Sequence, residues 1–85
     1  MPIIFTDDAW EQYQAWQHGD AKTLKRINKL IQDIQRNGAV GIGKAEPLRG
    51  AEGCWSRRID EKNRLVYKVE GENITITLCG SHYGK

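Results

Sequence analysis

The stretch AKTLKRINKLIQDIQR, residues 21–36, carries the clearest structural signal in this sequence of 85 residues. Its apolar stripe consists of Leu24, Ile27, Leu30, Ile31 and Ile34. These side chains recur every three or four positions, as on one face of a helix, while the lysines face outward. Asp20 can cap the first turn, and Asn37-Gly38 is a typical helix stop. The spacing therefore predicts an amphipathic helix over this stretch, with one face buried.

The residues before this helix predict a strand and another helix. Ile3-Ile4-Phe5 is typical of a short buried strand. Thr6-Asp7-Asp8 offers cap oxygens and places acids at a helix N-terminus, where the helix dipole favours them. Aromatic residues then recur at helical spacing up to Trp16, and Gly19 ends the pattern. The chain should therefore enter the main helix from a first, shorter helix.

From Trp55 on, apolar and polar residues alternate, as in strands with one buried face. Strands are expected at 55–59, 64–69 and 74–78, with turns at 60–63 and 71–73. The order predicts a two-layer α+β fold, β-α-α-β-β-β, in which two N-terminal helices pack on a mainly antiparallel sheet. A chain of this length has room for one domain, residues 1–85.

Size and composition limit the kind of protein. A core in so short a chain is thin, so we expect either a compact monomer or a homodimer or obligate complex that buries more surface. No apolar run approaches the ~20 residues that span a bilayer, and no signal peptide is evident, which indicates a cytoplasmic protein. Cys54 and Cys79 form no C-x-x-C pair and are expected to be reduced.

The charges are distributed unevenly along the chain. Residues 1–20 carry four acids and no Lys or Arg, whereas residues 21–68 carry twelve of the thirteen basic residues against five acids. Strand alternation places Arg58, Arg64 and Lys68 on the sheet face that the helices leave open. A basic face of this kind can bind phosphates, and it can equally be charged for solubility alone.

Two familiar binding motifs are absent from the sequence. Residues 38–44, GAVGIGK, match most of a phosphate-binding loop, but Ala45 stands where a hydroxyl is needed and the segment follows a helix where a strand is required. His18 and His82 have no Cys or carboxylate at ligand spacing, which argues against a zinc site. We therefore expect neither a nucleotide cofactor nor a metal.

Three side chains together make a sufficient set for RNA cleavage. A carboxylate such as Glu46 can remove the 2′-hydroxyl proton, and Arg64 can stabilise the charge that builds on phosphorus. His82 can protonate the leaving 5′-oxygen, although a histidine so near the chain end is also consistent with a polar tail. The residues themselves do not show that the three converge, because 36 positions separate Glu46 from His82.

Six stretches resemble one protein family in both order and spacing. They are WEQYQAWQ (10–17), KRINKLIQD (25–33), GKAEPL (43–48), WSRRI (55–59), NRLVY (63–67) and HY (82–83). The combination of WSRRI, RLVY and a near-terminal HY is specific. The chain resembles the YoeB (Txe) toxins, a branch of the RelE/ParE superfamily of bacterial toxin–antitoxin systems, over nearly its whole length.

This resemblance implies a RelE-like fold and cleavage of mRNA in the ribosomal A site, without cofactor or metal. It implies that Glu46 is the general base, Arg64 the transition-state stabiliser, His82 the general acid and Tyr83 the residue that orients the RNA. It implies further RNA or phosphate contacts from Lys44, Arg49 and Arg58. Lysines of the 21–36 helix, such as Lys22, Lys25 and Lys29, would contact the ribosome.

The same resemblance implies a homodimer, a cognate YefM-like antitoxin and no membrane partner. The sequence departs from the family at Gly84-Lys85, which follow the tyrosine that often ends such chains, and in a shorter loop at 50–54. Two alternatives stay open. A ParE-like toxin would inhibit its target without cutting RNA, and a plain RNA-binding module would have no catalytic set.

Overall fold

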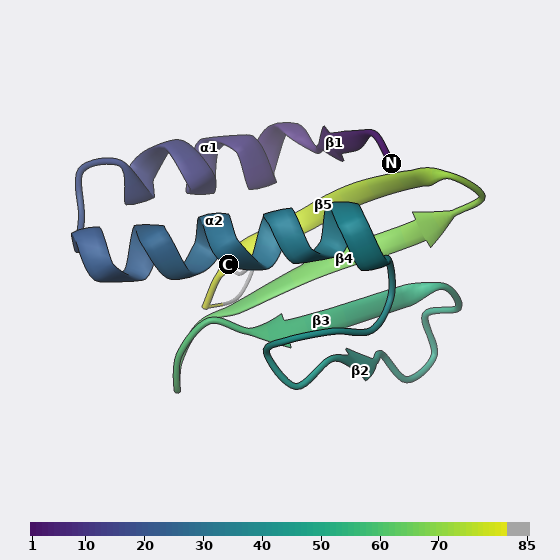
Figure 1. Cartoon of the computed structure of the whole chain (residues 1–85). Helices are drawn as coiled ribbons and strands as arrows, with labels where there is room; N and C mark the ends of the chain where they lie inside the picture. Colours follow the sequence, from purple (N-terminus) through teal and green to yellow (C-terminus); the bar gives the residue numbers. More distant parts are fainter. Residues whose placement is uncertain (82–85) are drawn as a thin grey trace.

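A five-stranded sheet and two helices build the protein, of which the computed structural model describes residues 1–81 (Figure 1). The elements are β1 (Ile3–Phe5), α1 (Asp7–Trp16), α2 (Ala21–Asn37), β2 (Glu46–Pro47), β3 (Cys54–Arg58), β4 (Arg64–Glu70) and β5 (Asn73–Gly80). The strand order is β1-β5-β4-β3-β2. β1 runs parallel to β5, and the other neighbours are antiparallel. The predicted two-layer α+β fold is confirmed, with the two-residue strand β2 as an addition.

Both helices begin and end where the sequence predicts. The Thr6 hydroxyl accepts a hydrogen bond from the Ala9 amide at 3.2 Å, and Asp20 accepts one from the Thr23 amide at the same distance. These side chains satisfy amide groups that the first turn of a helix leaves without partners. α2 ends at Gly38, whose φ of 79° suits a residue without a Cβ.

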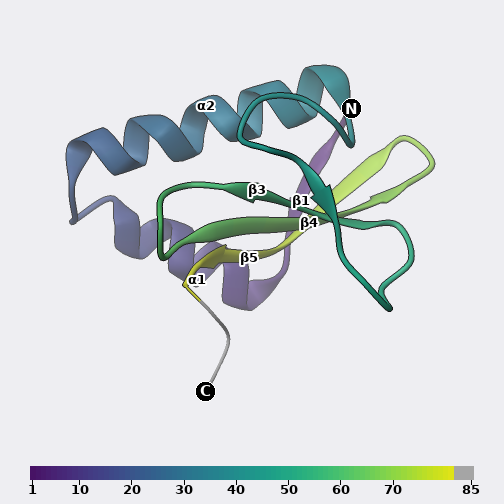
Figure 2. The same cartoon turned by 90° about the horizontal axis from the view of Figure 1, so that it is seen from below.

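The core lies between α2 and the sheet, with α1 beside α2 and β5. α2 lies on one side of β3 and β4 (Figure 2). Its predicted stripe is buried at Ile27, Leu30 and Ile34, which pack with β4 and β5 side chains. α1 borders β5 beyond the end of β1, where the side chains of Gln12 and Trp16 hydrogen-bond to the backbone of Cys79.

The first strand is less buried than its sequence predicts. β1 lies at the edge of the sheet and pairs with β5 alone. Ile4 is 46 % exposed, while Ile3 and Phe5 pack against the core. The prediction of a buried strand was therefore wrong at Ile4, because an edge strand this short has covered side chains only on its inner face.

Both cysteines are free thiols, and burial raises the pKa of Cys79 to about 12. Within residues 1–81, no helix is both long and apolar enough to cross a bilayer. In the same part of the chain, no three His, Cys, Asp or Glu side chains cluster closely enough to hold a metal ion.

Candidate active site

Glu46 and Arg64 meet on the face of the sheet that points away from α2. In β2, Glu46 pairs with Ser56 of β3, and Arg64 of β4 pairs with Arg58 at the end of the same strand. Arg64 Nη2 lies 3.5 Å from Glu46 Oε1, a salt bridge between residues 18 positions apart. The structure thus brings together a carboxylate and a guanidinium that the sequence could associate only through family resemblance.

Ser56 holds the guanidinium of Arg64 in place. Its hydroxyl accepts a hydrogen bond from Arg64 Nε, and Ser56 is only 2 % exposed. The side chains of Arg64 and Glu46 are 36 % and 67 % exposed, so both are open to a substrate. Among residues 1–81 the Arg64 guanidinium bonds only to Ser56 and Glu46, so further N–H groups remain that can bind an anion such as phosphate.

The remaining two predicted catalytic residues, His82 and Tyr83, lie outside the described residues. Gly80, the last residue of β5, is the ladder partner of Arg64, so the chain leaves the sheet next to Arg64.

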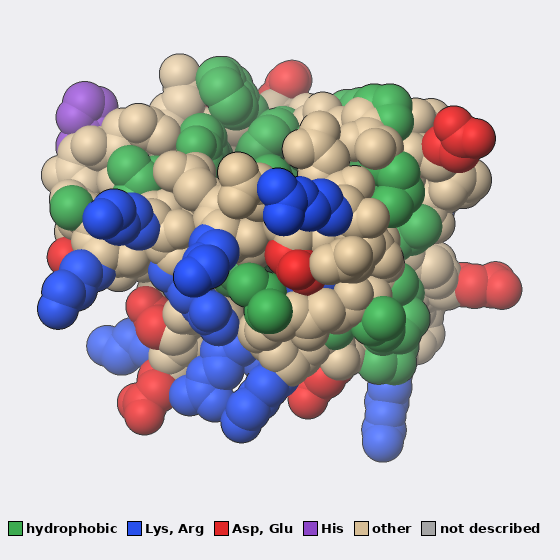
Figure 3. Space-filling model, viewed as in Figure 1, with side chains coloured by type: hydrophobic (Ala, Val, Ile, Leu, Met, Phe, Trp, Pro, Cys, Tyr) green, Lys and Arg blue, Asp and Glu red, His purple; other side chains and the backbone are tan. Residues whose placement is uncertain are grey.

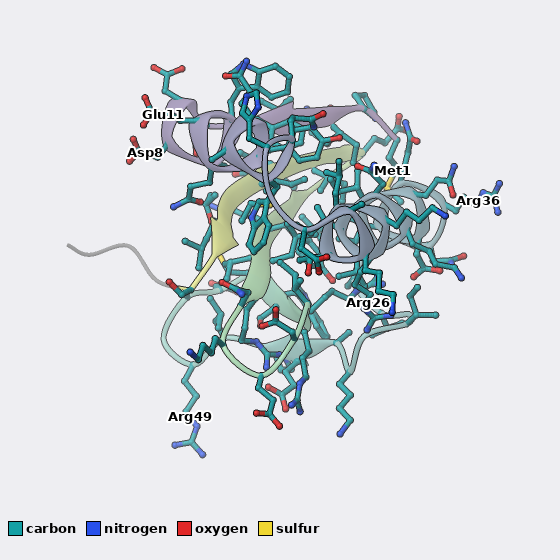
Figure 4. The ribbon with its side chains drawn as sticks, turned by 90° about the vertical axis from the view of Figure 1, so that its left-hand side faces the viewer. Met1, Asp8, Glu11, Arg26, Arg36 and Arg49 are labelled. Atoms are coloured by element: carbon teal, nitrogen blue, oxygen red, sulfur yellow. The ribbon has the colours of Figure 1, made fainter. Side chains whose placement is uncertain are left out.

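The predicted RNA contacts are spread around this pair. Arg58 is half-buried beside Arg64, where its carbonyl accepts a hydrogen bond from Arg26 at 3.2 Å. Lys44 is exposed on the loop before β2, and Arg49 extends away from the ribbon on the loop after it (Figure 4). Neither side chain makes a hydrogen bond or ion pair within residues 1–81. Lys68, at the other end of β4, pairs with Glu70 at 3.4 Å.

The exposed side of α2 is a second basic surface. Lysine and arginine side chains gather over this helix and on the part of the molecule below it (Figure 3). A shallow hollow of about 580 Å³ is lined by Lys22, Lys25, Arg26, Asn28, Lys29 and Gln32. Asp8 and Glu11 on α1 lie away from Arg26 and Arg36 on α2 (Figure 4). The acidic N-terminal segment and the basic residues that follow it in the sequence therefore also lie on different parts of the structure.

Arg57, Asp33 and Tyr67 form a cluster on the α2 side of the sheet that was not predicted. Arg57 is fully buried on the α2 side of β3, where its Nη1 pairs with Asp33 Oδ2 of α2 at 2.5 Å. Its Nε donates to the hydroxyl of Tyr67 at 2.9 Å, and its Nη atoms donate to the carbonyls of Gly38 and Ile42 at 3.0 and 2.9 Å. No role was predicted for Arg57, although strand alternation puts it on the face opposite Arg58, and a charge on an inner face needs a buried partner.

The pKa values of Asp33 and Tyr67 are shifted in opposite directions, by different causes. The hydrogen bond from Arg57 is the main reason that the pKa of Asp33 is lowered, with a further contribution from the Ile42 amide. Burial raises the pKa of the Tyr67 hydroxyl, which therefore stays protonated and donates to the carbonyl of Ala39 at 2.5 Å.

The shift on Asp33 predicts a loss of stability in acid. A carboxylate with a lowered folded-state pKa stabilises the protein above its unfolded value of about 3.9. This stabilisation is lost as the pH falls from there through the folded-state pKa. We expect the wild type to have a larger free energy of unfolding than Asp33→Asn at pH 7. This difference should decrease as the pH falls below about 4. Denaturant unfolding from pH 7 to 3 measures it, and Glu52→Gln, which removes an exposed carboxylate outside the cluster, serves as a control. A difference for Asp33→Asn that does not vary with pH would contradict the assignment.

Comparison with known proteins identifies the class to which this fold and site belong. Residues 5–83 match the family model described as "YoeB-like toxin of bacterial type II toxin-antitoxin system". The toxin YoeB of Streptomyces coelicolor is 49 % identical over 84 residues, which cover 98 % of this chain and all of that protein. The chain belongs to the YoeB-like toxin family.

Solved structures agree in both fold and length. A YoeB/ParE toxin from Agrobacterium tumefaciens superposes with a TM-score of 0.89 at 40 % identity, covering 98 % of this chain and all of that one. YoeB from Staphylococcus aureus has been solved as a dimer (TM-score 0.87, 45 % identity) and in a heterotetrameric YoeB-YefM toxin–antitoxin complex (0.86, 45 %), each covering 98 % of both chains. The toxin in the Escherichia coli RelBE complex, 19 % identical, shares the fold (TM-score 0.73, covering 98 % of both chains).

Proposed function

We propose that this chain is the toxin of a toxin–antitoxin pair and acts as an endoribonuclease on mRNA in the ribosomal A site. The observation that carries the proposal is the approach of Glu46 to Arg64 on an exposed sheet face, 3.5 Å apart. A non-catalytic toxin or RNA-binding module has no chemical need to hold a carboxylate beside a guanidinium in this way.

The reaction is an acid–base transfer to the 2′-hydroxyl that needs no metal. Glu46 removes the 2′-hydroxyl proton, the 2′-oxygen bonds to phosphorus, and the bond to the 5′-oxygen breaks. Arg64, held by Ser56, stabilises the negative charge on the phosphoryl oxygens. His82 donates a proton to the departing 5′-oxygen, and Tyr83 orients the RNA. The products are a 2′,3′-cyclic phosphate and a 5′-hydroxyl end.

The chain direction at the end of β5 supports the assignment of His82. Gly80 pairs with Arg64, and His82 is only two positions further along the sequence. An acid must stand across the phosphate from the base, so a histidine that follows the ladder partner of Arg64 fits this role.

Partners follow from the family and the charges. We propose a YefM-like antitoxin and a homodimer, since a close relative is known in both assemblies. The basic hollow along α2 would contact phosphates of ribosomal RNA, with Arg58, Lys44 and Arg49 nearer the mRNA. Such a toxin acts in the cytoplasm.

Mapping cleavage ends on a translated mRNA tests this function. We expect cuts that appear only when ribosomes are present and that keep one position relative to the reading frame, each with a 5′-hydroxyl on the downstream fragment. Cleavage of equal rate and position on naked mRNA would contradict the dependence on ribosomes. An intact mRNA in both reactions, with growth still inhibited by the toxin, would instead favour a non-catalytic toxin.

A further inference from the structure

The loop that leads to Glu46 is held by side chains on the α2 side of the sheet. Residues 38–45 connect α2 to β2. Three inward-facing side chains, Asp33, Arg57 and Tyr67, bind four backbone groups of this loop, and we call these three residues the loop clamp. The groups are the carbonyls of Gly38, Ala39 and Ile42 and the amide of Ile42.

The loop lies directly on the clamp, with no space between them. A Cβ on Gly41 would stand 1.9 Å from Asp33 Oδ2 and 2.9 Å from Arg57 Nη1. A Cβ on Gly43 would stand 2.7 Å from the side chain of Leu30, and its φ of 85° already favours glycine. Gly41 and Gly43 therefore allow the backbone of the loop to approach the side chains of Asp33, Arg57 and Leu30 closely.

Strand β2 cannot fix Glu46 without the loop. It has two residues, lies at the edge of the sheet and pairs with β3 alone. The side chain of Glu46 is 67 % exposed and meets Arg64 only at 3.5 Å, so this contact adds little restraint. After β2, the Leu48 amide donates to the Cys54 carbonyl at 2.9 Å. Before β2, the chain is restrained by the loop, through the clamp and through the Arg58 amide, which donates to the Gly43 carbonyl at 2.7 Å.

Strand β3 links the two sides of the sheet. Ser56 points to the exposed face and holds Arg64, while its neighbour Arg57 points to the opposite face and holds the loop. We propose that Arg57, supported by Asp33 and Tyr67, is a positioning residue for the catalytic base Glu46. This inference rests on the proposed ribonuclease function.

The test compares cleavage by Arg57→Lys and the wild type on programmed ribosomes. Lysine keeps the charge but cannot donate to Asp33, Tyr67 and two carbonyls at once. A misplacement of about 1 Å at a reacting group can lower a rate by about 100-fold. We expect kcat to fall by about 10- to 100-fold, with a smaller change in KM, because Lys44 is the one proposed RNA contact on this loop and the basic hollow along α2 is unchanged. Tyr67→Phe, which removes one of the clamp's contacts with the loop, should show the same pattern with a smaller loss and serves if Arg57→Lys does not fold.

Ile74→Val is the matched control for a structural effect. Ile74 is fully buried on β5, which β4 separates from β3, so this variant loses stability without touching the loop. It should keep the kcat of the wild type per folded molecule. Equal kcat values for Arg57→Lys, Tyr67→Phe and the control would overturn the proposal.

Amide exchange separates this inference from the proposed function. Measured on the toxin alone, without RNA, exchange in residues 39–47 should be faster in both clamp variants and unchanged in Ile74→Val. Unchanged exchange in the clamp variants would overturn the positioning role whatever the wild type cleaves. A wild type that cuts no mRNA while its clamp variants loosen this segment would contradict the ribonuclease function and leave Arg57 as the residue that holds the loop of Glu46.

Discussion

Replacing Glu46 by Gln is expected to lower the rate of ribosome-dependent mRNA cleavage by about 10²–10⁴-fold. The amide has the size of the carboxylate, and its oxygen can still accept a hydrogen bond from Arg64. It cannot take up the 2′-hydroxyl proton. The loss should therefore fall on the chemical step, with ribosome binding unchanged, and it is measured as the single-turnover rate of mRNA cutting at saturating toxin.

The matched control for this prediction is Glu52→Gln. Glu52 is an exposed acid on the turn that follows β2, and its replacement changes the net charge by the same amount. It should cleave like the wild type. Both variants should unfold at the same denaturant concentration as the wild type, because an exposed ion pair contributes about 0–1 kcal/mol. Full activity in Glu46→Gln would exclude it as the general base.

The secondary structure was predictable because it follows local rules. Each signal of α2 acts over a few residues: the apolar stripe repeats every three or four positions, Asp20 caps the amide of Thr23, and the positive φ of Gly38 ends the helix. The hairpins likewise join strands that are adjacent in sequence. The added strand β2 had no such signal, since two residues are too few to show a period.

The approach of Glu46 to Arg64 came from the family resemblance and not from local pattern. It depends on the pairing of β2 with β3, which in turn depends on the course of the 38–45 loop. That course is fixed by Arg57 and Asp33, which lie on a strand and a helix 24 positions apart. Alternation along β3 is consistent with the inward direction of Arg57, but no local pattern in the sequence indicates that Asp33 is its partner.

The ion pair between the fully buried Arg57 and the partly exposed Asp33 is expected to contribute strongly to stability. Replacing Asp33 by Ala should lower the free energy of unfolding by about 3–5 kcal/mol, because it leaves the fully buried guanidinium without a counter-charge. This is a large share of the roughly 5–15 kcal/mol that stabilises a domain. Unfolding in guanidinium chloride measures the loss, provided that the dependence on denaturant stays the same.

A double-mutant cycle distinguishes a missing partner from a missing side chain. Arg57→Met alone should also be strongly destabilising, since it removes the donors to Gly38 and Ile42 and leaves Asp33 unpaired. In the double variant no charge is left buried, so its loss should be smaller than the sum of the single losses by about 2–3 kcal/mol. Asp60→Ala, which breaks hydrogen bonds in the exposed β3–β4 turn but no ion pair, should show no coupling to Arg57→Met. Additive losses for Asp33 and Arg57 would mean that the two side chains stabilise the fold independently, and the ion pair would then have no energetic role.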